Sequence, residues 1–181
     1  MISKPALYLI FLILFQTNLF ALKNTDKKNL IATEILSLGF GGFLGYYGIK
    51  INDGKYELGL GLGYFHPNSG NVKAIGLYPS IRTFHSNRSV GIFYEAGLGL
   101  GRFKWDYENS FQPIKKVLFF PSVYLGYRMA SSFSLTITPY IGINYISGSL
   151  KAKDGNIARF GELKLDSGLS PALGLELGYL F

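Results

Sequence analysis

The sequence predicts an all-β fold, namely a transmembrane eight-stranded up-and-down antiparallel β-barrel. Apolar and polar residues alternate in seven or eight stretches, which is the period of a β-strand whose two faces differ. Several stretches reach 10 residues or more, the length that a tilted strand needs to cross a hydrocarbon core of about 30 Å. The chain has 23 Gly, 13 Tyr and 15 Phe but no Cys, so backbone pairing and packing must stabilise it without disulfides.

Residues 1–21 have the layout of a secretory signal peptide. Lys4 precedes an apolar run from Ala6 to Phe15, and a more polar stretch then ends at the small residue Ala21. The apolar run is shorter than the roughly 20 residues that a membrane-spanning helix needs. We therefore expect cleavage after Ala21, a polar linker over residues 22–28 and a barrel domain over residues 29–181.

The strands are expected in order along the barrel domain. The first, near Ile31–Leu38, has the weakest alternation, because Glu34 must face inward while Leu36 and Leu38 follow it. A tight turn at Gly39–Gly42 should lead to a second strand from about Phe43 to Ile51. The remaining alternating stretches are Tyr56–His66, Ile75–Phe84, Val90–Tyr107, Val117–Arg128, Phe133–Tyr145 and Leu169–Phe181.

The connections alternate in length. Short ones are expected at residues 52–55, 85–89 and 130–132, and longer ones around residues 66–70, 108–115 and 147–167. Bacterial outer-membrane barrels have short periplasmic turns and longer external loops. If the last strand ends in the periplasm, all three short connections lie there too.

The two faces of each strand indicate opposite surroundings. From Phe133 to Tyr145 every second residue is apolar, and those between are mostly polar or small. Aromatic residues lie near the ends of the apolar faces, as in an interfacial girdle: Tyr64, Tyr127, Tyr145 and Tyr179. The apolar face is predicted to contact lipid and the other to face a closed lumen, because unpaired backbone at a lipid-exposed edge costs several kcal/mol.

Three segments resemble the small eight-stranded outer-membrane barrels, especially the transmembrane domain of outer-membrane protein A. They are "GIKINDGKYELGLGLGYF", "GYRMASSFSLTITPYIGINY" and the terminal "LELGYLF". The resemblance implies an outer-membrane location in a two-membrane bacterium. It also implies that the barrel-insertion machinery reads the alternate residues Leu175, Leu177, Tyr179 and Phe181.

Charged residues on the polar face are expected inside the lumen. They are Glu34, Glu57, Glu95 and Glu176, with Lys50, Arg82 and Arg128. An unpaired buried charge costs several kcal/mol, so ion pairs are expected. A turn centred on Asn87 and Arg88 would place Arg82 diagonally across from Glu95.

A side-chain plug is the favoured interpretation of this lumen. Eight strands enclose only enough space for side chains to fill. Glycines at positions 59, 61, 63, 97, 99 and 101 leave room for Phe65, Tyr78, Phe103, Trp105, Phe120 and Tyr124. The alternative is a narrow, selective channel.

A lipid A-modifying enzyme is a less favoured alternative. His85, Ser86 and Glu95 are of the right types for a serine hydrolase, but adjacent residues on a strand point to opposite faces. His66 has no partners at metal-ligand spacing. A non-enzymatic protein without a cofactor or metal is expected.

The formal net charge is +7, and eight of the 18 Lys and Arg residues fall at or beyond the predicted external end. One interpretation is that these are ordinary charged loop residues in contact with solvent. The other interpretation is that they attract lipopolysaccharide phosphates or an anionic host ligand, because cations near a membrane surface attract anionic lipids. Nucleic acid is not an expected partner, and a monomer is expected. The residues of this external basic rim are Arg102, Lys104, Lys115, Lys116, Lys151, Lys153, Arg159 and Lys164.

Overall fold

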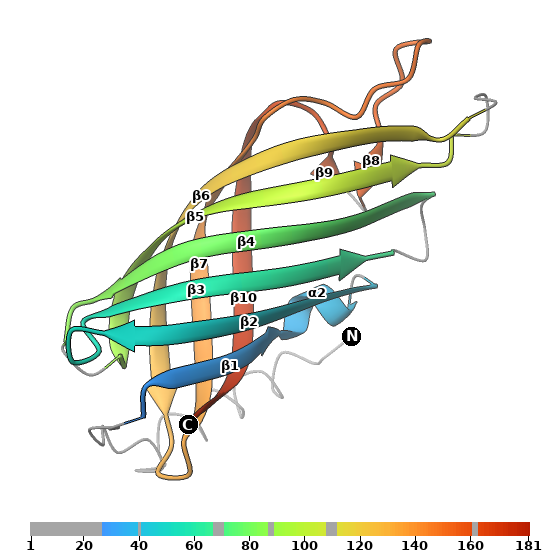
Figure 1. The fold of residues 1–181 in the computed structure, drawn as a ribbon. Helices are drawn as coiled ribbons and strands as arrows, with labels where there is room; N and C mark the ends of the chain where they lie inside the picture. Colours follow the sequence, from blue (N-terminus) through green and yellow to red (C-terminus); the bar gives the residue numbers. More distant parts are fainter. Residues whose placement is uncertain (1–26, 40, 67–70, 87–88, 108–111, 161–162) are drawn as a thin grey trace, which may run out of the picture.

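Eight antiparallel strands close into one barrel. The computed structural model describes residues 27–39, 41–66, 71–86, 89–107, 112–160 and 163–181 (Figure 1). The predicted signal peptide and most of the linker lie outside these residues. The barrel strands are β1 (Asn29–Glu34), β2 (Gly42–Ile51), β3 (Tyr56–Phe65), β4 (Val72–Phe84), β5 (Gly91–Trp105), β6 (Ile114–Ala130), β7 (Leu135–Ile146) and β10 (Gly168–Leu180).

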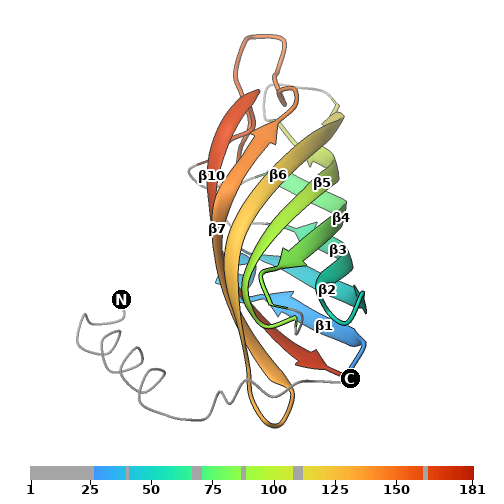
Figure 2. The ribbon, with the colours of Figure 1, turned by 90° about the vertical axis from the view of Figure 1, so that its left-hand side faces the viewer.

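The topology is up-and-down, as predicted. Each strand pairs with its neighbour along the chain, and β1 pairs with β10 to close the sheet. Asn29 and Phe181 exchange two backbone hydrogen bonds of 3.0 Å at the end of this seam. Figure 2 shows β10 and β7 beside β6 and β5, so that the wall is continuous through these strands. No barrel strand is left with an unpaired lateral edge, which is what burial in lipid requires.

The ends of the barrel differ in their connections. The turn end carries the short connections, and the loop end carries the longer ones. At the turn end, Asn52 and Asp53 adopt left-handed φ values of 51° and 52° before Gly54 at 83°. Asn and Asp tolerate this conformation better than most residues, which permits a tight hairpin. At the loop end, the β7–β10 connection contains a small hairpin of β8 (Arg159–Phe160) and β9 (Leu163–Lys164).

The prediction for the first strand was wrong in its second half. The strand ends at Glu34, and a short helix, α2 (Ile35–Gly39), replaces the expected continuation to Leu38. The Glu34 carboxylate accepts the backbone N–H groups of Leu36 and Ser37 at 3.0 Å and 2.5 Å, which satisfies donors at the start of a helix. The connection to β2 is therefore wider than the predicted tight turn at Gly39–Gly42, of which Phe40 lies outside the described residues.

The other strand predictions are correct in order and direction, with shifted ends. The β6 strand is longer than predicted and begins at Ile114. The β7 strand begins two residues late, because Phe133 and Ser134 lie in the preceding turn, where Ser134 has a φ of 68°.

Large apolar side chains cover the outer wall. Every barrel strand contributes to this apolar belt, and one exposed residue from each is Ile31, Tyr47, Leu60, Ile75, Leu98, Val123, Ile141 and Leu173. The predicted girdle residues Tyr64, Tyr127, Tyr145 and Tyr179 are also on this surface, each 43–51% exposed. Soluble monomers rarely expose so continuous an apolar surface, so the belt is suited to acyl chains. In the part of the chain that the structure describes, no helix is long and apolar enough to cross a membrane.

Candidate functional site

Buried side chains occupy the lumen in successive layers. At the turn end, Leu30, Ala32, Val90, Ala130 and Leu180 form a small apolar cluster with Tyr46. An ionic layer, a tyrosine layer and a second apolar cluster follow toward the loop end. We take these layers as the candidate site, because the side chains in the lumen determine whether a solute or ligand can enter or cross the barrel.

Arg82 is the centre of the ionic layer. Its guanidinium donates to Glu95, which lies directly opposite on β5, and to both carboxylate oxygens of Glu176 on β10, at 2.5 Å and 3.0 Å. The Glu57 carboxylate lies 3.6 Å away. Arg82 is only 2% exposed, so these carboxylates replace the water that its charge has lost.

Arg128 forms the second ion pair of the layer. It donates to the two carboxylate oxygens of Glu57 at 2.6 Å and 2.9 Å, and both residues are fully buried. Tyr46 also donates to Glu57, at 3.1 Å, and its ring lies 4.2 Å below the guanidinium carbon of Arg82. Glu57 therefore joins both arginines into one network that bridges opposite walls of the barrel.

Two predicted lumen charges lie on the inner face beside this hydrogen-bonded network, opposite Glu176 and Glu57 in the strand register. Glu34 caps the short helix and accepts a hydrogen bond from the backbone N–H of Leu175 at 3.2 Å. Lys50 is half-buried and lies opposite Glu57 in the β2–β3 register. Thus five of the seven predicted charges share one network, Lys50 borders it, and Glu34 stabilises the end of β1.

Tyrosines fill the middle of the barrel. Tyr78 hydrogen-bonds Ser122 at 2.9 Å, and Tyr124 donates to Asn144 at 2.5 Å. A Cβ atom on Gly97 would collide with the Tyr78 hydroxyl, so the glycine is needed for this close approach. The predicted role of glycines in making room for rings is therefore visible here.

The β7–β10 loop closes the loop end. Leu150, Ala158 and Leu165 are at most 2% exposed and pack against Phe103 and Leu118 of the barrel, with other residues of the same cluster. Backbone hydrogen bonds of 2.8–2.9 Å join the three loop residues to one another. We call residues 147–160 and 163–167 the loop cap. The sequence predicted an external loop here, because its buried apolar residues are few and do not alternate regularly.

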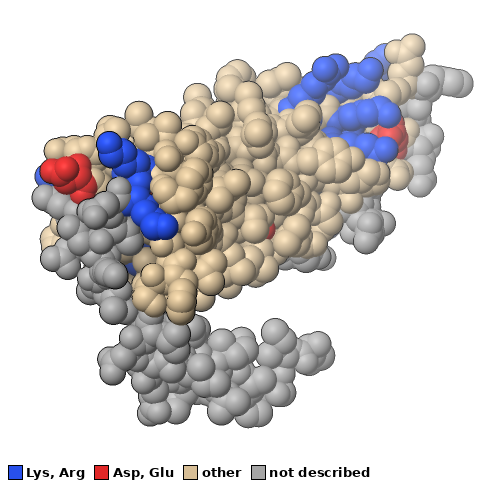
Figure 3. Space-filling model, turned by 60° about the horizontal axis from the view of Figure 1, so that its bottom comes forward, with Lys and Arg blue, Asp and Glu red and all other residues tan. Residues whose placement is uncertain are grey.

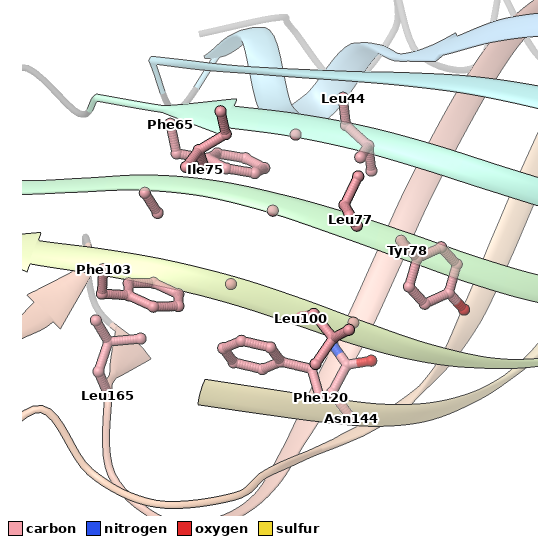
Figure 4. Close-up of a pocket in the computed structure, with 15 residues that line it drawn as sticks. Leu44, Phe65, Ile75, Leu77, Tyr78, Leu100, Phe103, Phe120, Asn144 and Leu165 are labelled. Atoms are coloured by element: carbon pink, nitrogen blue, oxygen red, sulfur yellow. The ribbon is translucent and has the colours of Figure 1, made fainter. Parts of the chain in front are cut away.

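A cavity of about 250 Å³ lies between the tyrosine layer and the loop cap. Figure 4 shows Phe65, Phe103 and Phe120 around it, with Leu165 of the loop cap at one side and Tyr78 and Asn144 at the other. Its lining is almost wholly apolar. None of the residues of the ionic layer lines this cavity.

Replacing Leu165 by alanine is expected to loosen the loop cap. Removing a buried leucine typically costs about 2–5 kcal/mol, and each 1.4 kcal/mol changes an opening equilibrium about tenfold. Trypsin cleavage after Arg159, followed by mass spectrometry, should therefore be about tenfold faster or more than in the wild type. The control is Leu169→Ala, at a residue that is 74% exposed. Equal cleavage rates for both variants would contradict the packing role of Leu165.

The tip of the loop cap is held by a polar contact. Tyr107 donates to the Asp154 carboxylate at 2.5 Å, and Asn156 donates to the same carboxylate at 3.0–3.1 Å. The Tyr107 hydrogen bond is the main cause of a lowered pKa for Asp154. The carboxylate therefore stays ionised at neutral pH and links the loop cap to the β5–β6 connection.

The predicted basic rim divides into two groups. Arg102, Lys104 and Lys115 are on the outer wall at the loop ends of β5 and β6. Lys116 donates to the backbone oxygen of Ser149 at 2.8 Å and so contacts the loop cap. The remaining rim residues belong to the loop cap itself: Lys151, Lys153, Arg159 and Lys164.

The residues of the hydrolase alternative do not form a catalytic arrangement. Ser86 donates to the backbone oxygen of Val90 at 2.7 Å, within the β4–β5 connection, while Glu95 binds Arg82 in the lumen. His85 is exposed at the turn end. The described residues also include no group of three or more His, Cys, Asp or Glu that could hold a metal ion.

Solved structures similar to this chain are eight-stranded barrels of the outer membrane type. The N-terminal β-barrel domain of Pseudomonas aeruginosa OprF is 16% identical, with a TM-score of 0.55 over 86% of this chain and 98% of that one. Neisserial surface protein A is 17% identical, with a TM-score of 0.53 over 85% of this chain and 94% of that one. No protein-family model and no curated protein matches the sequence. The predicted resemblance to small outer-membrane barrels is confirmed at the level of the fold.

Proposed function

We propose that this protein is an integral outer-membrane barrel with a closed lumen, whose role is structural or is surface interaction through its loop end. The observation that carries the proposal is the combination of a lipid-suited outer wall with an interior that is filled from the turn end to the tyrosine layer. A protein built in this way presents its loops to the exterior without needing to transport a solute. We propose that it is not an enzyme.

The proposed location predicts a specific behaviour in gels. Protein extracted from the outer membrane should migrate faster before boiling than after it, because a closed hydrogen-bonded barrel stays compact in detergent. The control is the same sample boiled before loading. A water-soluble periplasmic species without this shift would overturn the location and the role together.

The alternative, a narrow channel, is separated from the proposal by conductance. Purified wild-type protein in a planar bilayer should show no reproducible single-channel steps, because the side chains of the Arg82 and Arg128 network and of the tyrosine layer occupy the lumen. Gel migration of protein from the same vesicles serves as the control for insertion. Reproducible steps would show that the lumen opens and would favour the channel.

The partners of the proposed function are of three kinds. Lipopolysaccharide would meet the cations on the barrel wall at the loop end, and an extracellular host ligand would meet the loop cap. The barrel-insertion machinery would read the alternate residues of β10 during assembly. Loss of acyl chains from lipid A in cells that overexpress this protein would support the enzyme alternative. Supporting the non-enzymatic proposal, the hydroxyl of Ser86 and the carboxylate of Glu95 are already bound within the protein.

A further inference from the structure

We propose that four cations on the outer wall bind the phosphorylated headgroup of a lipid in the surrounding leaflet. We call Lys73, Arg102, Lys104 and Lys115 the wall cation patch. The inference rests on the proposed function, since it requires that the barrel is embedded in a membrane. It goes further by naming the site and the ligand chemistry.

The strand register brings the four side chains together. Lys73 on β4 lies directly opposite Lys104 on β5, and Lys104 lies directly opposite Lys115 on β6. Directly opposite residues on neighbouring strands have Cβ atoms about 4.5–5.5 Å apart. Arg102 is two residues from Lys104 on the same strand and therefore on the same face. The outer face of the sheet thus carries a row of three lysines across three strands. Arg102 lies next to the middle lysine, two residues closer to the centre of the barrel.

The wall cation patch faces outward at the border of the apolar belt. Its neighbours on the same strands, Ala74 and Phe103, point inward and are buried. Arg102 lies opposite Ile75 and Val117, which are 61% and 54% exposed. A lipid whose acyl chains lie against these residues would carry its headgroup at the height of the lysines. Figure 3 shows charged side chains gathered near the ends of the molecule, with a wall of uncharged residues between them.

The charge in this patch is poorly balanced by the protein. Like charges directly opposite each other destabilise a sheet, and here three lysines are aligned across three strands. Among the described residues, the carboxylate that forms an ion pair with the patch is Asp106, 3.0 Å from Lys104. An excess of positive charge therefore remains for an external anion. Phosphate fits this chemistry, because arginine can bind its oxygens with two parallel N–H groups and lysines add point charges.

The other basic residues of the loop end do not share this geometry. Lys116 faces the loop cap, where its ammonium group contacts Ser149. Lys151, Lys153, Arg159 and Lys164 belong to the loop cap, beyond the ends of the barrel strands. These four residues provide a control set with the same formal charge as the wall cation patch.

The test measures retention of lipid A by protein in phosphatidylcholine vesicles that contain either bis-phosphorylated or dephosphorylated lipid A. Native mass spectrometry of protein released from these vesicles counts the bound lipid. The wild type should retain the bis-phosphorylated form about tenfold more than the dephosphorylated form, since several near-surface cations contribute. The variant Lys73→Gln/Arg102→Gln/Lys104→Gln/Lys115→Gln should lose this preference. The variant Lys151→Gln/Lys153→Gln/Arg159→Gln/Lys164→Gln should stay within about twofold of the wild type.

Each contrary result has a distinct meaning. Equal loss in both variants would overturn the wall site in favour of diffuse charge attraction. Displacement of the lipid by millimolar inorganic phosphate would show a free-phosphate site instead of a lipid site. Heat-dependent gel migration is recorded for every sample: its absence in the wild type would refute membrane insertion, whereas insertion without a lipid preference would refute only this inference.

Discussion

Replacing Arg82 by methionine is expected to lower the free energy of unfolding by about 3–5 kcal/mol, the range seen when one partner of a buried ion pair is removed. The guanidinium binds Glu95 and Glu176 and lies 3.6 Å from Glu57. Methionine removes the charge but keeps an unbranched side chain, so lost volume contributes little to the effect. Glu95 and Glu176 would then lose their arginine partner, while Glu57 would keep Arg128.

Urea unfolding in phosphatidylcholine vesicles, followed by Trp105 fluorescence and by gel migration, measures this change. The matched control is Arg102→Met, which makes the same chemical change on the outer wall and should shift stability by less than about 1 kcal/mol. Adding Glu176→Gln to Arg82→Met should recover part of the loss, because one unpaired carboxylate is removed. If Arg82→Met and Arg102→Met unfolded at the same urea concentration, the network would have no central role in stability.

The alternating pattern was sufficient to predict the barrel but not its exact register. Period-2 alternation determines which residues face the lumen, so the positions of Arg82 and Glu95 on the inner face followed from counting. Their predicted diagonal relation was wrong, because they lie directly opposite each other. The predicted turn centre, Asn87 and Arg88, lies outside the described residues. A turn with polar residues on both sides does not specify its own centre.

Tertiary hydrogen bonds explain what the pattern missed in the first strand. Glu34 was expected to join the lumen charge network. It is buried opposite Glu176, but its carboxylate accepts hydrogen bonds from backbone donors of α2 and β10 and, among the described residues, from no arginine. The partner on β10, Leu175, is 141 residues away in the sequence. No local signal around Glu34 encodes a contact of that range.

The wall cation patch shows the opposite case, in which a residue was missed although the sequence contained the signal. Lys73 precedes the predicted start of its strand at Ile75, so it was not counted with the external basic rim. The β4 strand in fact begins at Val72, which places Lys73 in register with Lys104. Strand ends are set by pairing with neighbours, and β5 extends far enough to pair with these residues.

Replacing Leu173 by arginine is expected to destabilise the barrel by about 2–4 kcal/mol, the cost of an arginine near the bilayer midplane on the lipid face of a barrel. Leu173 lies in the middle of β10 and is 72% exposed. Leu169, on the same strand and face, is 74% exposed but lies at the loop end. The same substitution there should cost about 0–1 kcal/mol, because an arginine near the interface reaches water and headgroups.

These two variants test directly whether the apolar belt contacts lipid. They introduce the same side chain at sites of nearly equal exposure, so they differ chiefly in depth along the barrel. Urea unfolding of both proteins in the same vesicles gives the difference between their free energies of unfolding. In a soluble barrel both sites would face water, and Leu173→Arg would cost no more than Leu169→Arg. A difference of about 2 kcal/mol or more therefore requires a medium at mid-barrel that is much less polar than the medium at the loop end.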